Sequence, residues 1–137
     1  MGISCIIRDM EITWSYLDRQ YRARIEPAVV PYVETIGAEK ACQLFLKFGG
    51  GEIYFAREPR QRNPTELVKT IGADAVKRIF ENPEIDTAGC VPLAMYFCIR
   101  FLHNEGVAIQ EIARRVRCTT VTVRKVLSHP HLPGARK

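Results

Sequence analysis

The sequence predicts a mainly α-helical fold with a short β-strand. Two observations support this fold class: a pattern of helix, glycine and helix occurs twice between residues 28 and 88, and the last third of the chain carries two closely spaced amphipathic helices. We therefore expect a helical assembly domain over residues 1–90, with repeat units at about 28–56 and 64–88. A C-terminal domain over 91–129 and a tail over 130–137 follow it.

Charge is distributed unevenly along the 137 residues. Residues 1–99 hold 12 Lys and Arg against 13 Asp and Glu, whereas residues 100–137 hold 8 against 2. The net charge of +5 therefore comes from the C-terminal segment, which favours an acidic partner there. The hydrophobic fraction of 47% and the charged fraction of 26% are typical of a globular chain and exclude a disordered or fibrous one.

The first predicted element is an amphipathic helix that begins at Met10 and ends near Glu26. Its apolar residues recur in steps of four, three, four and four, with polar side chains on the other face: Met10, Trp14, Leu17, Tyr21 and Ile25. Pro27 and Pro31 end this helix, because proline lacks the amide hydrogen that a helix interior needs.

The first helix-glycine-helix unit follows. A short helical segment over 32–36 leads to Gly37, which easily takes the backbone conformation that closes a helix. Four apolar residues then mark one face of a second helix: Ala41, Leu44, Phe45 and Phe48. This helix ends at the glycines 49–51, and the alternating, β-forming residues of 52–56 predict a short strand.

The second unit begins at residues 63–66, where Asn63 is the expected N-cap. Residues 33–45 and 68–80 are identical at six of thirteen positions, which indicates an internal duplication. The second copy differs after Phe80, where residues 84–88 are the only candidate for a second strand.

The last third is predicted to be helical again. Residues 93–103 are apolar on almost every side except at Arg100, so we expect a central buried helix there. Ile109, Ile112, Ala113 and Val116 then form one face of a short helix, and Val123, Val126 and Leu127 form the inner face of the next. Thr119 is the expected N-cap between them, and Arg117 stands where the turn requires a positive φ, at a cost of about 1 kcal/mol.

A helix-turn-helix requires a small residue where its two helices cross, a turn of about three residues and a capping residue at the start of the second helix. The sequence offers an alanine, a three-residue turn and a threonine at these places. On this interpretation four residues face the DNA bases: Thr120, Val121, Arg124 and Lys125. Five others are placed to contact phosphates: Arg114, Arg115, Arg117, Thr119 and Thr122. Three arginines after the predicted strand either contact the DNA backbone or belong to a solvated linker: Arg57, Arg60 and Arg62.

The segment 109–127 resembles the DNA-binding helix-turn-helix of bacterial regulators. Seven residues fit that pattern: Ile112, Ala113, Cys118, Thr119, Thr122, Val123 and Val126. Arg117 stands where those regulators usually have glycine. A second resemblance combines this terminal segment with residues 34–55, where helices, glycines and a strand follow one another. The same order is found in the Mor and C middle and late transcription activators of Mu-like phages and prophages, which this chain resembles. This second resemblance spans roughly residues 30–60 and 90–128.

The Mor-like resemblance implies an intertwined homodimer in which helices and a strand from each subunit build a shared N-terminal dimerisation domain. It further implies contact with host RNA polymerase and an activator role at a phage or prophage promoter. The strand residues that would lie near the dimer axis are Gly50, Gly51, Ile53, Tyr54 and Phe55. Independently of the resemblance, one helix-turn-helix makes few base contacts, so such proteins usually gain sequence specificity by binding two half-sites as a dimer.

Other functional classes find little support in the sequence. We expect no catalytic residues, no metal site and no cofactor, because the serines, histidines and acidic residues show no recognisable catalytic or ligand spacing. The five cysteines lack any C-x-x-C pair and are interpreted as reduced core residues. No membrane span or signal peptide is predicted, so a cytoplasmic protein is expected.

The sequence leaves two alternatives open. The first is a repressor or another mobile-element regulator that uses the same DNA-binding module. The second is a protein-interaction or assembly factor in which the two C-terminal helices are purely architectural and their basic outer face is only solvated.

Overall fold

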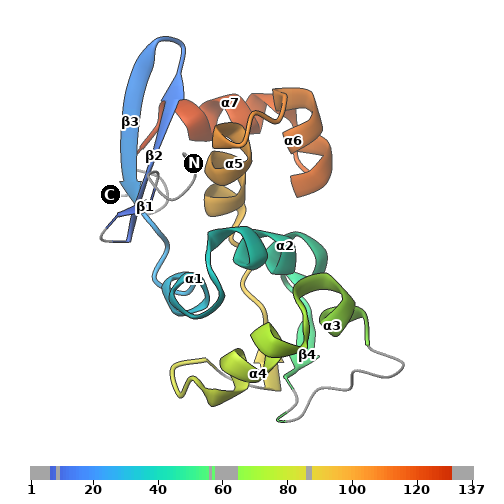
Figure 1. The fold of residues 1–137 in the computed structure, drawn as a ribbon. Helices are drawn as coiled ribbons and strands as arrows, with labels where there is room; N and C mark the ends of the chain where they lie inside the picture. The colour runs from blue at the N-terminus through green and yellow to red at the C-terminus, as the bar shows by residue number, and fades with distance from the viewer. Residues whose placement is uncertain (1–6, 9, 56, 58–64, 86–87, 131–137) are drawn as a thin grey trace. The chain divides into compact units, whose positions relative to one another are not determined.

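The computed structural model describes residues 7–8, 10–55, 57, 65–85 and 88–130. They divide into two units, one formed by the described residues of Met1–Glu26 and Met95–Lys137 and the other by those of Pro27–Ala94 (Figure 1). Seven helices and five short strands are present in these residues, so the chain is mainly α-helical as expected. The described residues before Pro27 group with the C-terminal helices, whereas the predicted assembly domain of 1–90 placed them with the glycine-joined helices.

The predicted helix over 10–26 is wrong, because this segment is a β-hairpin. Strands β2 (Glu11–Tyr16) and β3 (Arg19–Arg24) pair antiparallel, and β1 (Ile7–Arg8) pairs with β2 on its other side. Buried Ile12 and Trp14 alternate with more exposed neighbours, which is the period of a strand. Leu17, which the helix interpretation placed on the buried face, lies in the turn and is 75% exposed.

The hairpin packs against α5 (Met95–Asn104) and α7 (Thr120–Ser128) through Trp14. The indole Nε1 of Trp14 donates a hydrogen bond of 2.8 Å to the main-chain oxygen of Leu127. The guanidinium of Arg100 lies 4.6 Å from the centroid of the Trp14 ring and donates to the main-chain oxygen of His129 at 3.2 Å. Arg100 therefore joins the hairpin, α5 and the end of α7 at one buried point.

The predicted central helix is confirmed, and its one charged residue is its most unusual feature. Arg100 is 0% exposed. Burial lowers the pKa of Arg100 to about 10, and the negative charge of Glu26 partly opposes that effect. The guanidinium therefore remains charged at neutral pH, and it is stabilised by Glu26 and by the faces of the Trp14 and Tyr96 rings.

The end of α5 also supplies hydrogen bonds to β2 beyond the two residues that pair with β1. His103 Nε2 hydrogen-bonds the main-chain oxygen of Ser15 at 2.7 Å, and the Asn104 side chain donates to the main-chain oxygen of Thr13. These two carbonyls point away from β3, so the side-chain donors satisfy backbone groups that an edge strand would leave to solvent.

The second unit contains the predicted duplication. The first copy comprises α1 (Val30–Ile36), Gly37, α2 (Ala38–Phe48) and β4 (Glu52–Tyr54). The second comprises α3 (Glu66–Ile71), Gly72, α4 (Ala73–Glu81) and β5 (Ala88–Cys90). Gly37 (φ 88°, ψ 162°) and Gly72 (φ 92°, ψ 151°) have nearly the same backbone conformation, so the two copies share their central joint.

The two copies pack against each other in a reciprocal manner. The first helix of each copy contacts the second helix of the other, α1 with α4 and α2 with α3. Strands β4 and β5 pair antiparallel, with Ile53 opposite Gly89. An approximate two-fold relation between the copies would produce this pattern, so the second unit resembles a dimer built within one chain.

Two boundaries differ from the predicted ones. The N-cap of α3 is Thr65, whose hydroxyl accepts from the amide of Val68 at 3.3 Å; the predicted cap, Asn63, lies outside the described residues. The second strand lies at Ala88–Cys90 rather than within 84–88, because its partner Glu52–Tyr54 sets the register.

Replacing either joint glycine by alanine should destabilise the second unit by about 1–3 kcal/mol, because both occupy a backbone region that is costly for other residues. Nothing lies within 4 Å of a Cβ added at Gly37 or Gly72, so the loss would come from backbone strain alone. Urea unfolding of Gly37→Ala and Gly72→Ala measures it. Gly51→Ala is the comparison, because Gly51 has no positive φ and its added Cβ would lie 3.3 Å from the main-chain oxygen of Phe48, so any cost there is steric. Wild-type midpoints for both joint variants would refute the strain argument.

Candidate nucleic-acid interface

The predicted pair of C-terminal helices is confirmed. Helix α6 (Ile109–Val116) and helix α7 contact each other, and both contact α5. Ile112 and Ala113 of α6 are buried, as are three residues on the inner side of α7: Val123, Val126 and Leu127. Because Ala113 has a small side chain at this contact, α6 and α7 can approach closely.

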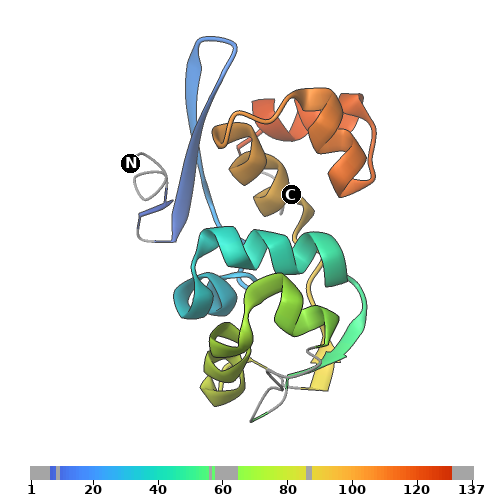
Figure 2. The same ribbon diagram turned by 45° about the vertical axis from the view of Figure 1, so that its right-hand side comes forward.

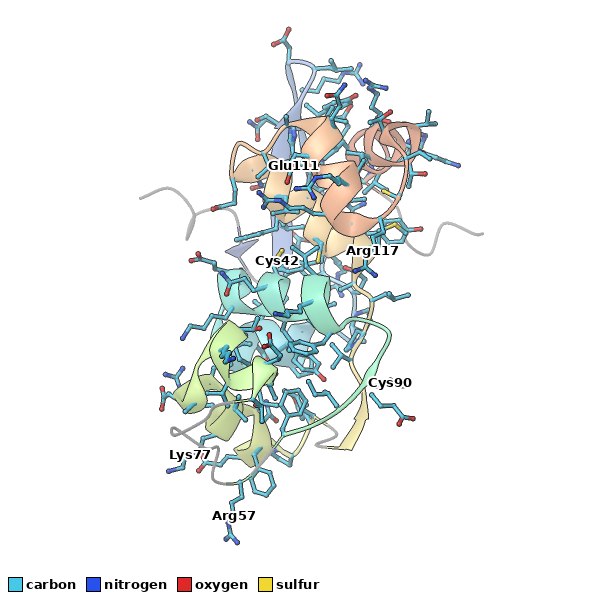
Figure 3. The ribbon with its side chains drawn as sticks, turned by 90° about the vertical axis from the view of Figure 1, so that its right-hand side faces the viewer. Cys42, Arg57, Lys77, Cys90, Glu111 and Arg117 are labelled. Atoms are coloured by element: carbon cyan, nitrogen blue, oxygen red, sulfur yellow. The ribbon has the colours of Figure 1, made fainter. Side chains whose placement is uncertain are left out.

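The turn between the helices depends on the backbone of Arg117. This residue has φ 67° and ψ 49°, the left-handed conformation that the sequence predicted. The amide of Cys118 donates back to the main-chain oxygen of Ala113 at 2.9 Å and so closes α6. The Arg117 side chain is exposed, which leaves its charge available at the turn (Figure 3).

Thr119 caps the start of α7, as predicted. Its hydroxyl oxygen accepts from the amide of Thr122 at 3.1 Å, and the hydroxyl donates to the Thr122 hydroxyl at 3.2 Å. The Thr119 hydroxyl is therefore occupied within the cap, whereas the Thr122 hydroxyl retains its own hydrogen for another acceptor. Of the two threonines predicted to contact phosphates, Thr122 is the one whose hydroxyl remains available as a donor.

The outer face of α7 combines apolar and cationic groups. Val121 is 70% exposed, Arg124 and Lys125 are exposed, and Thr120 is half-buried. In the part of the chain that the structure describes, neither Arg124 nor Lys125 pairs with a carboxylate. At the end of the helix, Ser128 and His129 hydrogen-bond the main-chain oxygens of Arg124 and Lys125.

Two of the arginines predicted to contact phosphates, Arg114 and Arg115, are paired with a carboxylate of the same helix. Glu111 accepts hydrogen bonds from both Arg114 and Arg115, at 3.0 Å from Arg114 Nε and 2.9 Å from Arg115 Nε. The hydrogen bond from Arg114 has the larger effect and that from Arg115 adds to it. Together they lower the pKa of Glu111 to about 2, so its carboxylate is ionised at neutral pH. This charged group was not predicted from the sequence, although Glu111 precedes the two arginines by three and four residues, the spacing at which side chains meet on a helix.

The remaining candidates lie in the second unit or outside the described residues. Arg57 is exposed and its side chain points away from the ribbon (Figure 3). Arg60 and Arg62 are outside the described residues.

The predicted dimer-strand residues are used within the chain. Gly50 donates to the main-chain oxygen of Val91 at 2.7 Å, Val91 donates back to Gly51 at 2.9 Å, and β4 then pairs with β5. Phe55 is buried.

No protein-family model, curated protein or solved structure matches this chain. Among the described residues, no three His, Cys, Asp or Glu side chains gather as a metal site would require. None of the described helices is both long and apolar enough to cross a bilayer. Of the cysteines, Cys42 and Cys98 are buried as expected, whereas Cys90 is exposed.

If this surface binds nucleic acid, Glu111→Gln should tighten its binding to duplex DNA several-fold at low salt. The change releases two guanidinium groups for phosphates, and each new phosphate contact should steepen the salt dependence of log K by about 0.9. Fluorescence anisotropy with a labelled duplex over a salt series measures both effects.

The control for this prediction is Glu105→Gln, which removes the same charge from an exposed residue of the same unit that forms no ion pair with the described residues. Equal tightening by both variants would show that net charge alone matters and would contradict the specific role of Glu111.

Proposed function

We propose that the protein is a sequence-specific regulator of transcription that binds double-stranded DNA through α6 and α7. The observation that carries this proposal is the uncovered outer face of α7, where Val121, Arg124 and Lys125 are exposed on a short helix whose other side is anchored. A helix of this size fits the major groove of B-DNA, and an exposed face that combines cations with an apolar side chain can read base edges there.

Each residue has a distinct role in this proposal. Arg124 donates two hydrogen bonds to a guanine edge, and Val121 contacts a thymine methyl group. Lys125 contacts a base edge or a neighbouring phosphate. Arg117 and Thr122 bind phosphates that fix the position of α7, and Arg114 and Arg115 join them only when a phosphate replaces Glu111.

The similarity of residues 34–55 and 109–127 to the Mor and C activators supports a narrower proposal: an activator of a phage or prophage promoter that acts as a homodimer and contacts host RNA polymerase. A dimer would double the number of base contacts. Because one edge of β4 is paired with β5 of the same chain, two copies would have to join through another edge or surface. A repressor with the same DNA module is distinguished from an activator by reporter output at a mapped site.

The decisive experiment selects bound duplexes from a random pool and measures the affinity for the selected site across a salt series. Arg124→Ala should weaken specific binding by about 1–3 kcal/mol and relax the preference at one base position, because it removes a bidentate base contact. Arg124→Ala combined with Lys125→Ala should also flatten the salt dependence.

The matched control is Lys40→Ala combined with Lys77→Ala, which removes the same charge from exposed positions of the second unit. It should leave the selected site and the affinity nearly unchanged. Absence of duplex binding by the wild-type protein at low salt would refute the proposal and favour a purely architectural role for the two helices.

A further inference from the structure

Strand β3 of the first unit has one edge without a partner strand. The order of the sheet is β1-β2-β3, so β3 lies at its end. Figures 1 and 2 show the hairpin beside α5, with the turn between its strands at the top of both views. Among the described residues, α5 packs against β2, and no other strand pairs with β3. An open strand edge offers main-chain donors and acceptors with which another chain can pair.

The pairing within the hairpin shows which residues point their main-chain groups toward the open edge. Gln20 and Arg22 lie opposite Ser15 and Thr13 of β2. The carbonyls of Ser15 and Thr13 bond to side chains at the end of α5, so they point away from β3. In an antiparallel pair of this kind, both residues point their N–H and C=O groups away from each other. The main-chain groups of Gln20, Arg22 and, by alternation, Arg24 therefore lie on the open edge. None of them bonds to another described main-chain group.

The strand is held in its extended conformation by contacts on its other face. Ala23 is buried, and the ring of Tyr21 stacks on the ring of Trp14 with the two centroids 5.7 Å apart. Trp14 is itself only 2% exposed and is bonded to the main chain of Leu127. A segment that pairs with β3 would therefore meet a strand that is already ordered, which lowers the entropy cost of binding.

The face of β3 that points away from Trp14 is cationic. Arg22 and Arg24 are two positions apart, so their side chains lie on the same face, about 7 Å apart along the strand. The Arg22 side chain is 73% exposed and lies 3.6 Å from a carboxylate oxygen of Glu11. Arg24 is exposed and forms no ion pair with any described residue. No acidic residue belongs to β3, so its charge favours an anionic partner.

Charge and main-chain chemistry decide among the possible occupants of this edge. A second copy of β3 would bring further arginines and no acid, and like charges on paired strands are destabilising. A duplex on this face would also meet Glu11, and it has no main chain to pair with the outward carbonyls. An added acidic strand would lie beyond β3, roughly 10 Å from β2, and would pair with the N–H and C=O groups alike.

We propose that the open edge of β3 binds an extended, acidic segment of a partner protein as an additional strand. Acidic side chains at every second position of the segment pair with Arg22 and Arg24, and the apolar side chain between them lies beside Tyr21. The main-chain groups of Gln20, Arg22 and Arg24 supply the hydrogen bonds, and the arginines set the charge preference. The site does not use the outer face of α7, so the proposal is independent of DNA binding.

The first test titrates the whole protein into a labelled peptide of about eight residues in which glutamate and valine alternate. Arg22→Ala combined with Arg24→Ala should weaken binding at low salt about five- to tenfold, because two pairs of opposite charges across the strands are lost. Lys40→Ala combined with Lys77→Ala removes the same charge from exposed positions of the second unit and should leave the affinity nearly unchanged. Equal losses in both double variants would overturn the proposal, because general charge attraction would then explain the binding.

The second test asks whether the two main chains pair. Because the N–H of Arg22 points away from β2, Arg22→Pro should leave the hairpin folded and remove one donor from the open edge. It should bind the peptide about tenfold more weakly than Arg22→Ala, which keeps that donor. Hydrogen exchange followed by NMR asks the same question of the wild-type protein. Bound peptide should slow the exchange of the Gln20, Arg22 and Arg24 amides.

Two further outcomes would overturn the proposal. Absence of peptide binding, or binding that leaves these amides exchanging as before, would reduce the arginines to preventing two copies from pairing at this edge. Protection of the same amides by a duplex and not by the peptide would identify a nucleic-acid surface instead. The affinity of the Arg124 and Lys125 variant for duplex DNA is measured separately, so either proposal can fail while the other stands.

Discussion

The contact among Arg100, Trp14 and the end of α7 is the interaction on which the first unit depends. A guanidinium with no solvent exposure is tolerated only where other groups replace its hydration, and the Trp14 ring, the His129 carbonyl and the charge of Glu26 do so here. These groups come from segments separated by up to 115 positions. Their meeting places the β2–β3 hairpin beside α5 and the end of α7, and it supports α7 on the side that does not face solvent.

The parts of the fold that could be predicted from sequence are those that local chemistry decides. The turn at Arg117, the cap at Thr119 and the two glycine joints each depend on neighbouring residues, and all four were located correctly. The hairpin could not be placed in this way, because Trp14, Tyr21 and Ile25 fit the period of a helix as well as that of two antiparallel strands. Partners distant in the sequence, Arg100 and Leu127, decide between the two.

The reciprocal packing of the second unit has a physical reason. Its helices have 6 to 11 residues, which is too short for stability in isolation, so each copy needs the other to bury its apolar face. Because α1 contacts α4 and α2 contacts α3, this requirement is met within one chain. The paired strands β4 and β5 complete the arrangement. The duplication therefore provides, within one chain, the helix and strand contacts that two identical chains would otherwise make with each other. A dimer of this protein would need further contacts of its own.

The pairing of charges in the first unit separates two kinds of basic residue. Glu111 holds Arg114 and Arg115, and its low pKa keeps that arrangement charged over the physiological range. Within the described residues, Arg117, Arg124 and Lys125 have no such acidic partner. A basic surface that is entirely unpaired binds any duplex tightly, which reduces the difference between correct and incorrect sites. In the proposed DNA complex, pairing the two arginines of α6 with Glu111 while Arg124 and Lys125 of α7 stay unpaired would lower the sequence-independent part of the binding energy and would leave base recognition to α7.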